Sequence, residues 1–196
     1  MADGTQQRMV TAAVESLRRR GIAGTSFTEV LASSGAARGA VYHHFPGGKA
    51  ELVGRALEQT GEHVGSALAA LPHCRDESHV IDAFLSLVRP VVEESAGGAG
   101  CAVAAIATEA PPGDHLQIAS GEILSGWCET LSTLLHDAGA STERAEAIAA
   151  LLIATLEGAH VLCRANASIV PFDRAAAAMR AAFASEEPVP STLTDC

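Results

Sequence analysis

Residues 35–49 read GAARGAVYHHFPGGK, and this short stretch predicts a turn, a helix and a second break. Gly35 can adopt a positive φ at no steric cost, so it suits the end of one helix just before another begins. Pro46 ends the second helix because proline lacks the N–H that the next backbone hydrogen bond needs. The pattern is therefore helix, tight turn, helix.

The second of these helices has two different faces. If it begins at Ala37 or Arg38, the i, i+4 spacing places Val41 and Phe45 together on an apolar face that can pack inward. Arg38 and Tyr42 then share another face, which stays outside. We expect this outer face, with small residues beside it, to fit against DNA.

Hydrogen-bond donors give the outer face its expected role. Arg38 and His43 are expected to reach base edges or nearby phosphates, since the fork of arginine meets O6 and N7 of guanine together. Phosphate contacts are expected from Tyr42, His44 and Lys49, the last at a helix start that favours an anion. The neighbouring candidates are Ala37, Gly39 and Ala40, with Thr25, Ser26 and Thr28 at the start of the preceding helix.

The segment from Gly35 to Leu52 resembles the recognition helix of the TetR family of one-component transcription repressors, whose pattern is roughly G-x-S-x-G-T/S-x-Y-x-H-F-x-x-K-x-x-L. Ala37 and Ala40 depart from that pattern because they lack the hydroxyl groups usual in the family. The sequences PGGK at 46–49 and GCAVAA at 100–105 are similar to the LmrA-type branch of the family. The matching residues are Gly35, Gly39, Tyr42, His44, Phe45, Lys49 and Leu52.

The resemblance implies a homodimeric repressor that binds a palindromic double-stranded DNA operator through paired helix-turn-helix units. It also implies a small, largely apolar effector that enters the larger part of the chain and ends DNA binding. The long helix after Lys49 would carry motion between the two parts.

Charge is distributed unevenly along the 196 residues, whose formal net charge is −10. Residues 1–60 hold seven basic and five acidic residues, a net charge of +2, and the remainder holds six basic and eighteen acidic residues, a net charge of −12. Only the N-terminal part is therefore expected to approach phosphates without strong repulsion.

The chain is predicted to be all-α, because alanine and leucine dominate and no strand-like alternation persists. Besides the two short helices around Gly35, helical patterns cover about 6–20, 49–71, 76–96, 101–108, 114–138, 143–166 and 171–183. Ser26 and Glu29 form a capping box, and Pro90 should kink or divide its helix. We expect a three-helix DNA-binding domain at 1–48, a helical effector-binding and dimerisation domain at 49–184, and a disordered tail at 185–196.

Two further sets of residues are candidates for binding. A cavity for the effector is expected within the larger domain, with Glu109 and Glu157 as the acids that would meet a cationic effector; a filled core is the alternative. The candidate cavity residues are Cys101, Ile106, Glu109, Trp127, Leu152, Leu156 and His160.

The last two helices carry more apolar residues than one core needs, so a two-fold four-helix interface is expected, and packing within one subunit is the alternative. The candidate interface residues are Ile148, Leu151, Thr155, Ala159, Leu162, Ala175, Met179 and Phe183.

Other classes of protein are less consistent with the sequence. An enzyme would need Cys101 or Cys128 to act with a histidine, but no spacing favours a pair and no nucleophile elbow, phosphate loop or zinc motif is present. His43 and His44 point about 100° apart on a helix, so neither a metal nor a cofactor is expected. An acidic helical interaction module without DNA binding is the other alternative.

The sequence has no run of eighteen apolar residues and no targeting pattern, which predicts a cytoplasmic protein. The five cysteines are dispersed and odd in number, so reduced thiols are expected.

Overall fold

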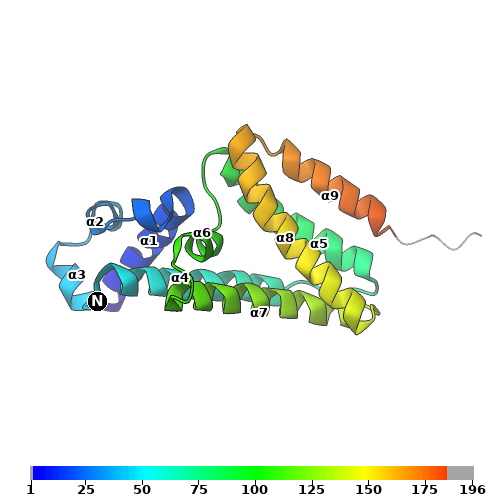
Figure 1. Cartoon of the computed structure of the whole chain (residues 1–196), viewed down its shortest axis with the longest axis horizontal. Coiled ribbons are helices and arrows are strands. Elements are labelled where there is room, and N and C mark those ends of the chain that lie inside the picture. Colours follow the sequence, from blue (N-terminus) through cyan, green and yellow to red (C-terminus); the bar gives the residue numbers. More distant parts are fainter. Residues whose placement is uncertain (1, 185–196) are drawn as a thin grey trace, which may run out of the picture.

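The computed structural model describes residues 2–184, and within them the chain forms nine α-helices and no strand (Figure 1). This confirms the predicted all-α fold. The helices are α1 (Ala2–Gly24), α2 (Phe27–Ser34), α3 (Gly39–His44), α4 (Gly48–Ala69), α5 (Glu77–Ala96), α6 (Ala102–Glu109), α7 (His115–Asp137), α8 (Thr142–Asn166) and α9 (Val170–Ala182).

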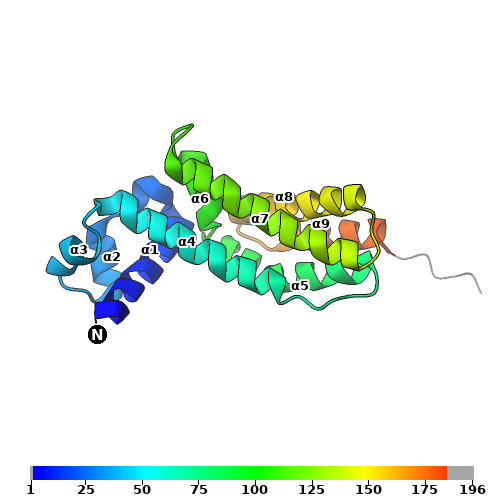
Figure 2. The same cartoon turned by 90° about the horizontal axis from the view of Figure 1, so that it is seen from below.

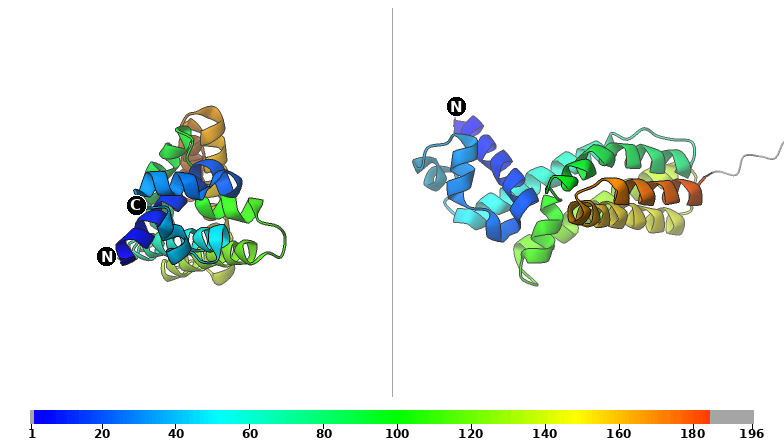
Figure 3. Two further views of the ribbon diagram at one scale, coloured as in Figure 1. Left: turned by 90° about the vertical axis from the view of Figure 1, so that its left-hand side faces the viewer. Right: turned by 90° about the horizontal axis from the view of Figure 1, so that it is seen from above.

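The molecule is elongated, with α1–α3 at one end and α8 and α9 toward the other (Figure 1). We call the part formed by α1–α3 the head, and the part formed by α4–α9 the body. Helix α4 leaves the head and runs along α7 (Figures 1 and 2). Helix α8 packs on α7 and α5, and α9 packs on α8, as Figure 3 shows from above. Helix α6 lies against α1, so the head packs on α6 as well as on α4.

Local signals form the head as the sequence predicts. Ser26 caps α2 by accepting a hydrogen bond from the Glu29 N–H at 3.4 Å, although the Glu29 carboxylate pairs with Arg20 instead of completing the capping box. Gly35 ends α2 with a φ of 66°. The side chains that fill the centre of the head are Leu17, Val30, Val41 and Phe45, each at least nine-tenths buried.

The buried apolar residues of head and body form one continuous cluster rather than two separate cores. It runs from Met9 in α1, through Leu52 and Leu57 in α4, to Met179 in α9. A three-helix unit of this size buries little apolar surface, so its stability depends on α4 and α6. The division at residues 48 and 49 stays a prediction, and the expected tail at 185–196 lies outside the described residues.

Two helix boundaries bear on the predicted pattern. Helix α5 continues through Pro90 from Glu77 to Ala96, so the expected division there is wrong. The helical backbone of α1 breaks at Gly21, with φ 66° and ψ −169°, next to the predicted end near residue 20, and a short helical segment follows the break. The second, short segment of α1 thereby turns toward α6.

Helix α8 is long and apolar enough to cross a membrane by length and composition, with 44% of its most apolar window buried in the protein. It packs against α5, α7 and α9 within the described chain. Core helices of globular proteins pass the same test, so this property alone does not indicate a membrane span.

Helix α4 approaches α7 closely at its glycines. A Cβ added at Gly61 would lie 2.8 Å from Cδ1 of Ile123, and one added at Gly65 would lie 3.7 Å from Nε1 of Trp127. The Trp127 indole N–H donates a hydrogen bond to the Gly61 carbonyl at 3.2 Å. Trp127 therefore joins α7 to α4 at this close contact.

Replacement of Gly21 is expected to destabilise the protein. A Cβ at this position would lie 1.7 Å from Oε1 of Glu109, and the backbone conformation is one that other residues rarely adopt. For Gly21→Ala we expect a loss of at least about 1–3 kcal/mol in the free energy of unfolding, measured by urea denaturation.

The control is Gly121→Ala on α7, where a Cβ meets nothing within 4 Å. It should leave stability unchanged or raise it by up to about 1 kcal/mol, since alanine favours a helix more than glycine does. Equal stability of the two variants would contradict the role assigned to Gly21.

Candidate nucleic-acid interface and ligand cavity

The outer face of α3 lies at the end of the molecule farthest from α9 (Figure 1). Arg38, Tyr42 and His43 are exposed, with Tyr42 85% exposed, whereas Val41 and Phe45 are buried. A large aromatic side chain that stays in water at the tip of a domain is available to a partner. Helix α3 therefore has the buried face and the exposed face that the i, i+4 spacing predicts.

Most arginines of the head are already occupied by the protein itself. Arg20 pairs with Glu29, Arg19 with Glu15, and Arg18 with Glu94. Within the described chain, the side chains of Arg38 and Lys49 make no hydrogen bond or ion pair with the protein. Among the basic side chains of α1–α3 and the start of α4, these two are thus free to meet an anionic partner.

The hydroxyl groups before and within α2 differ in their surroundings. Thr25 is only 1% exposed, and its hydroxyl donates to the Gly21 carbonyl at 2.8 Å and lies 3.0 Å from Ser16 Oγ. The expectation that Thr25 contacts DNA is wrong, because its side chain is inside the head. Ser26 and Thr28 are exposed, although Ser26 also caps the helix.

The remaining expected DNA residues surround the outer face. Ala37 and Gly39 are exposed, Ala40 is half-buried, and the half-buried His44 ring lies edge-on to that of His43, with centroids 4.8 Å apart. At the start of α4, the Glu51 carboxylate accepts a hydrogen bond from the Gly47 N–H at 2.8 Å. Since Glu51 already occupies this helix end, the Lys49 side chain is what remains there for a phosphate.

A cavity of about 400 Å³ lies between the head and the body. Five of the expected residues line it, namely Cys101, Trp127, Leu156, Glu157 and His160. Ile106 and Leu152 are fully buried and lie outside its lining. Glu109 lies elsewhere, on the contact between α6 and α1, where its carboxylate accepts a hydrogen bond from the Ala23 N–H at 3.0 Å.

Several cavity residues could not be predicted from the sequence. Arg18 on α1, His63 on α4 and Glu94 on α5 line the cavity together with the predicted residues of α7 and α8. Helical periodicity shows which face of each helix is apolar but not which helices meet around a space. The polar residues at the edges of those apolar faces were the one signal in the sequence for these positions in the cavity wall.

Burial controls the ionisation of the groups in the cavity wall. Burial raises the pKa of Glu157 above its ordinary value. Burial, and then the charge of Glu157, raise the pKa of the neighbouring Cys101 thiol well above its usual range. Burial, and then the positive charge of Arg18, lower the pKa of His160 from 6.5 to about 4. His160 is neutral at neutral pH, and its Nδ1 lies 2.7 Å from Ser95 Oγ.

Hydrogen bonds from arginine side chains join the head to the body beside this cavity. The Arg18 guanidinium donates to the Gly100 carbonyl at 3.1 Å and to the Glu94 carboxylate at 2.6 Å. Arg164 of α8 donates to the Arg19 carbonyl at 2.9 Å. The Arg18 side chain therefore both lines the cavity and attaches α1 to the body.

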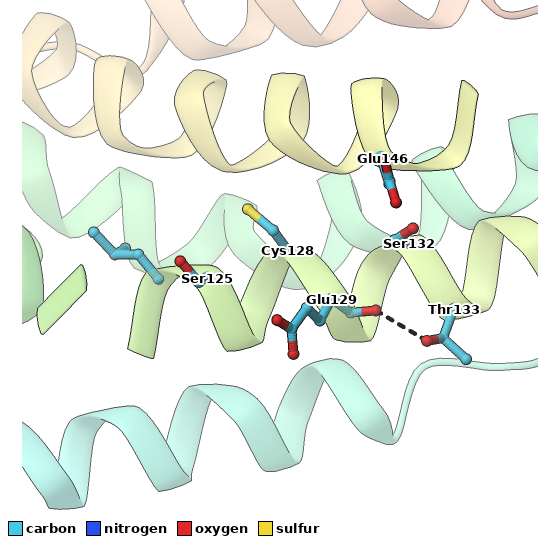
Figure 4. Close-up of a pocket in the computed structure, with 7 residues that line it drawn as sticks. Ser125, Cys128, Glu129, Ser132, Thr133 and Glu146 are labelled. Carbon is cyan, nitrogen blue, oxygen red and sulfur yellow. Dashed lines mark hydrogen bonds between the residues drawn. The ribbon is translucent and has the colours of Figure 1, made fainter. Parts of the chain in front are cut away.

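A second hollow, of about 550 Å³, lies on the surface between α7 and α8 (Figure 4). Cys128 and Glu129 of α7 and Glu146 of α8 contribute to it, and the Thr133 hydroxyl donates to the Glu129 carbonyl at 3.0 Å. Burial, and then Glu129, raise the pKa of the Cys128 thiol. A nucleophilic cysteine needs a lowered pKa, so neither this thiol nor Cys101 is activated for catalysis.

The described residues contain no group of three or more His, Cys, Asp or Glu side chains that could hold a metal ion.

Helix α8 has an apolar face that no other part of the described chain covers. Leu151, Val161 and Leu162 are 45%, 68% and 53% exposed. Three expected interface residues, Ile148, Ala159 and Met179, are instead buried within one subunit, so a partner cannot reach them. Thr155, Ala175 and Phe183 are half-buried.

Comparisons with known proteins match both parts of the chain. Residues 10–56 match the profile of bacterial regulatory proteins of the tetR family, and residues 78–178 match that of the LmrA/YxaF-like transcriptional regulator C-terminal domain. The HTH-type transcriptional regulator Rv0196 of Mycobacterium tuberculosis is 32% identical over 87% of this chain and 89% of its own length. LmrA of Bacillus subtilis is 27% identical over 81% of this chain and 85% of its own length.

Solved structures agree with these matches. A TetR transcriptional regulator from Chloroflexus aurantiacus superposes with a TM-score of 0.79 at 26% identity, and covers 95% of this chain and 98% of that chain. A regulatory protein TetR from Rhodobacter sphaeroides gives a TM-score of 0.78 at 18% identity, and covers 90% of this chain and 97% of that chain.

The burial of His160 predicts a specific loss of stability in acid. Its pKa is about 4 when folded, against an ordinary value of 6.5, so between these values the unfolded chain binds a proton that the folded chain does not. The free energy of unfolding should fall as the pH drops through this window, by up to about 3 kcal/mol from this group. Urea denaturation across the window measures it.

The variant His160→Gln should lose this part of the pH dependence, whereas His136→Gln, at an exposed position, should keep it. The comparison of variants is needed because the raised pKa of Glu157 has the opposite effect on stability. If His160→Gln and the unaltered protein respond to acid alike, the assignment to His160 is wrong.

Proposed function

The chain belongs to the TetR family of transcriptional regulators, in its LmrA/YxaF-like branch, and we propose that it is a repressor released from DNA by a small, largely apolar effector. The observation that supports the proposal most is the exposed face of α3, where Arg38 and Tyr42 have no partner in the described chain. We further propose that residues 1–48 bind DNA, that residues 49–184 bind the effector and dimerise, and that the protein works in the cytoplasm.

The proposed DNA contacts follow from exposure and charge. Arg38 and His43 would reach base edges from α3, and Tyr42 and Lys49 would contact phosphates beside them. Because α3 spans only six residues, few side chains can enter the major groove at once. Additional contacts would come from Ser26, Thr28, Ala37, Gly39, Ala40 and His44.

The proposed dimer uses the uncovered face of α8. Leu151, Val161 and Leu162 share that face with small residues such as Ala154 and Gly158, which let a second helix approach closely. A two-fold pairing of α8 and α9 would place the two heads on the same side of the dimer. Each head would then meet one of two successive major grooves, about 34 Å apart.

The cavity supports the proposed release by an effector. A ligand in the cavity would contact Arg18 directly, and Arg18 holds α1 to the body through Glu94 and the Gly100 carbonyl. Occupation of the cavity would therefore change how the head is held, favouring a spacing of the two heads that no longer fits the operator.

The alternatives have less support. An interaction module without DNA binding would have no need of a cavity between its two parts or of two unpaired cations at its tip. A cysteine-dependent enzyme would need an activated thiol, whereas the pKa of both Cys101 and Cys128 is raised.

The DNA-binding proposal is tested by selecting duplexes from a random pool at moderate salt. Arg38→Ala should relax the selected sequence and cost about 1–3 kcal/mol of discrimination at one position, because a base contact is lost. Lys49→Ala should weaken binding to all sequences alike and reduce the salt dependence by about one phosphate contact.

The control is Arg180→Ala, which removes a cation that pairs with Asp82 on the body. It should leave both sequence preference and salt dependence unchanged. A purified protein without sequence preference would overturn the proposal, and equal loss of specificity from Arg38→Ala and Lys49→Ala would overturn the division of roles.

The proposed dimer interface is tested with Val161→Asp. A charge on the uncovered face of α8 should favour the monomer and weaken operator binding, because the operator needs both heads. Sedimentation velocity measures the oligomeric state. Ile118→Asp, which places the same charge at an exposed apolar position on α7, is the control and should remain dimeric. A dimeric Val161→Asp variant would exclude this interface.

A further inference from the structure

We propose that the cavity between head and body takes a lipophilic cation, an apolar molecule with an ammonium group that the Glu157 carboxylate holds. This inference rests on the proposed function, since it names the class of effector for the same cavity.

The first observation is an unpartnered oxygen. Glu157 lines the cavity, and its carboxyl group has the Cys101 thiol as a hydrogen-bonding neighbour, but its Oε1 is inaccessible to solvent and has no hydrogen-bond partner among the described residues. Buried polar atoms in folded proteins are nearly always paired, so this atom calls for a donor from outside the protein. A carboxylate accepts hydrogen bonds and carries negative charge, and an ammonium group provides both the donor and the opposite charge.

The second observation is the balance of charge around the cavity. The titratable and charged groups in its wall are Arg18, His63, Glu94, Cys101, Glu157 and His160. Arg18 and Glu94 pair with each other at 2.6 Å, so their charges offset. Glu157 is the carboxylate left without a cation.

The histidines and the thiol do not supply that missing charge. His160 is neutral at neutral pH because its pKa is about 4, and the Cys101 thiol stays protonated because its pKa is raised. His63 is exposed to solvent, which screens a charge there. An anionic ligand would meet an unbalanced carboxylate, and a cationic ligand would neutralise it.

The third observation is the apolar remainder of the wall. Leu68, Val88 and Leu156 face the cavity, as does Trp127, whose indole N–H is already bonded to the Gly61 carbonyl. These groups offer an organic molecule contact area but few polar partners. A volume of about 400 Å³ accommodates a small aromatic or alkyl body beside the ammonium group.

The experiment compares three probes with one skeleton and different charge, namely phenylbutylamine, phenylbutanol and phenylbutyrate. Trp127 is the single tryptophan of the chain and lies in the cavity wall, so its fluorescence reports occupation directly. At neutral pH the amine should bind at least about tenfold more tightly than the alcohol, since a hydrogen bond to a charged group is stronger than one between neutral groups. Phenylbutyrate should bind most weakly.

The variant Glu157→Gln keeps the size of the side chain and removes its charge. In this variant the amine should lose its advantage over the alcohol, while the affinity for the alcohol stays within about twofold. Glu146→Gln is the matched control, because Glu146 is an exposed carboxylate on the same helix, and it should keep the preference of the unaltered protein.

The pH dependence provides a second measurement. The pKa of Glu157 is raised, so a fraction of it is protonated in mild acid and cannot pair with a cation. Affinity for the amine should therefore rise as the pH increases from mildly acidic to neutral, whereas affinity for the alcohol should change little. Glu157→Gln should remove the rise.

The outcomes separate this inference from the proposed function. A preference for phenylbutyrate, an undiminished amine preference in Glu157→Gln, or no change in Trp127 fluorescence with any probe would each overturn the inference. A protein that selects an operator yet shows no amine preference keeps the regulator proposal and loses this one. One that binds the amine through Glu157 but selects no operator gives the reverse result.

Discussion

The attachment of α1 to the body through Arg18 is the interaction on which the arrangement of this molecule depends. The head is too small to be stable on its apolar core alone, and it is held by α4 on one side and by α6 and the loop before it on the other. Arg18 strengthens this second attachment through Glu94 of α5 and the Gly100 carbonyl, and its side chain also forms part of the cavity wall. One guanidinium group therefore both attaches α1 to the body and lines the cavity.

Ion pairs within the protein limit how much of the positive charge of the head is available to a partner. The first sixty residues carry a small excess of positive charge, which suggests a broad basic surface. In the structure most of those arginines pair with acids of the protein, and Arg38 and Lys49 remain free. Recognition of DNA would thus depend on a few groups at the tip of the molecule, while the acidic body repels phosphate.

Local features of the fold could be predicted from the sequence, and features that depend on distant contacts could not. The helices follow from periodicity, from caps such as Ser26 and from turn residues such as Gly35. The burial of Thr25 depends on the break at Gly21, which turns the end of α1 toward α6. The apolar pattern of α8 is correct, but it cannot show that Ile148 faces the subunit's own core while Leu151 stays outside.

The close contact of α4 with α7 has a consequence for how the two ends communicate. At Gly61 and Gly65 helix α4 presents bare backbone, so it has no side-chain ridges there to interlock with α7 in a single register. The register of the two helices is set instead by the Ile123 side chain against Gly61 and by the hydrogen bond from Trp127 to the Gly61 carbonyl. A change in the position of Trp127 would therefore act directly on the backbone of α4, the helix that continues to α3 at its other end.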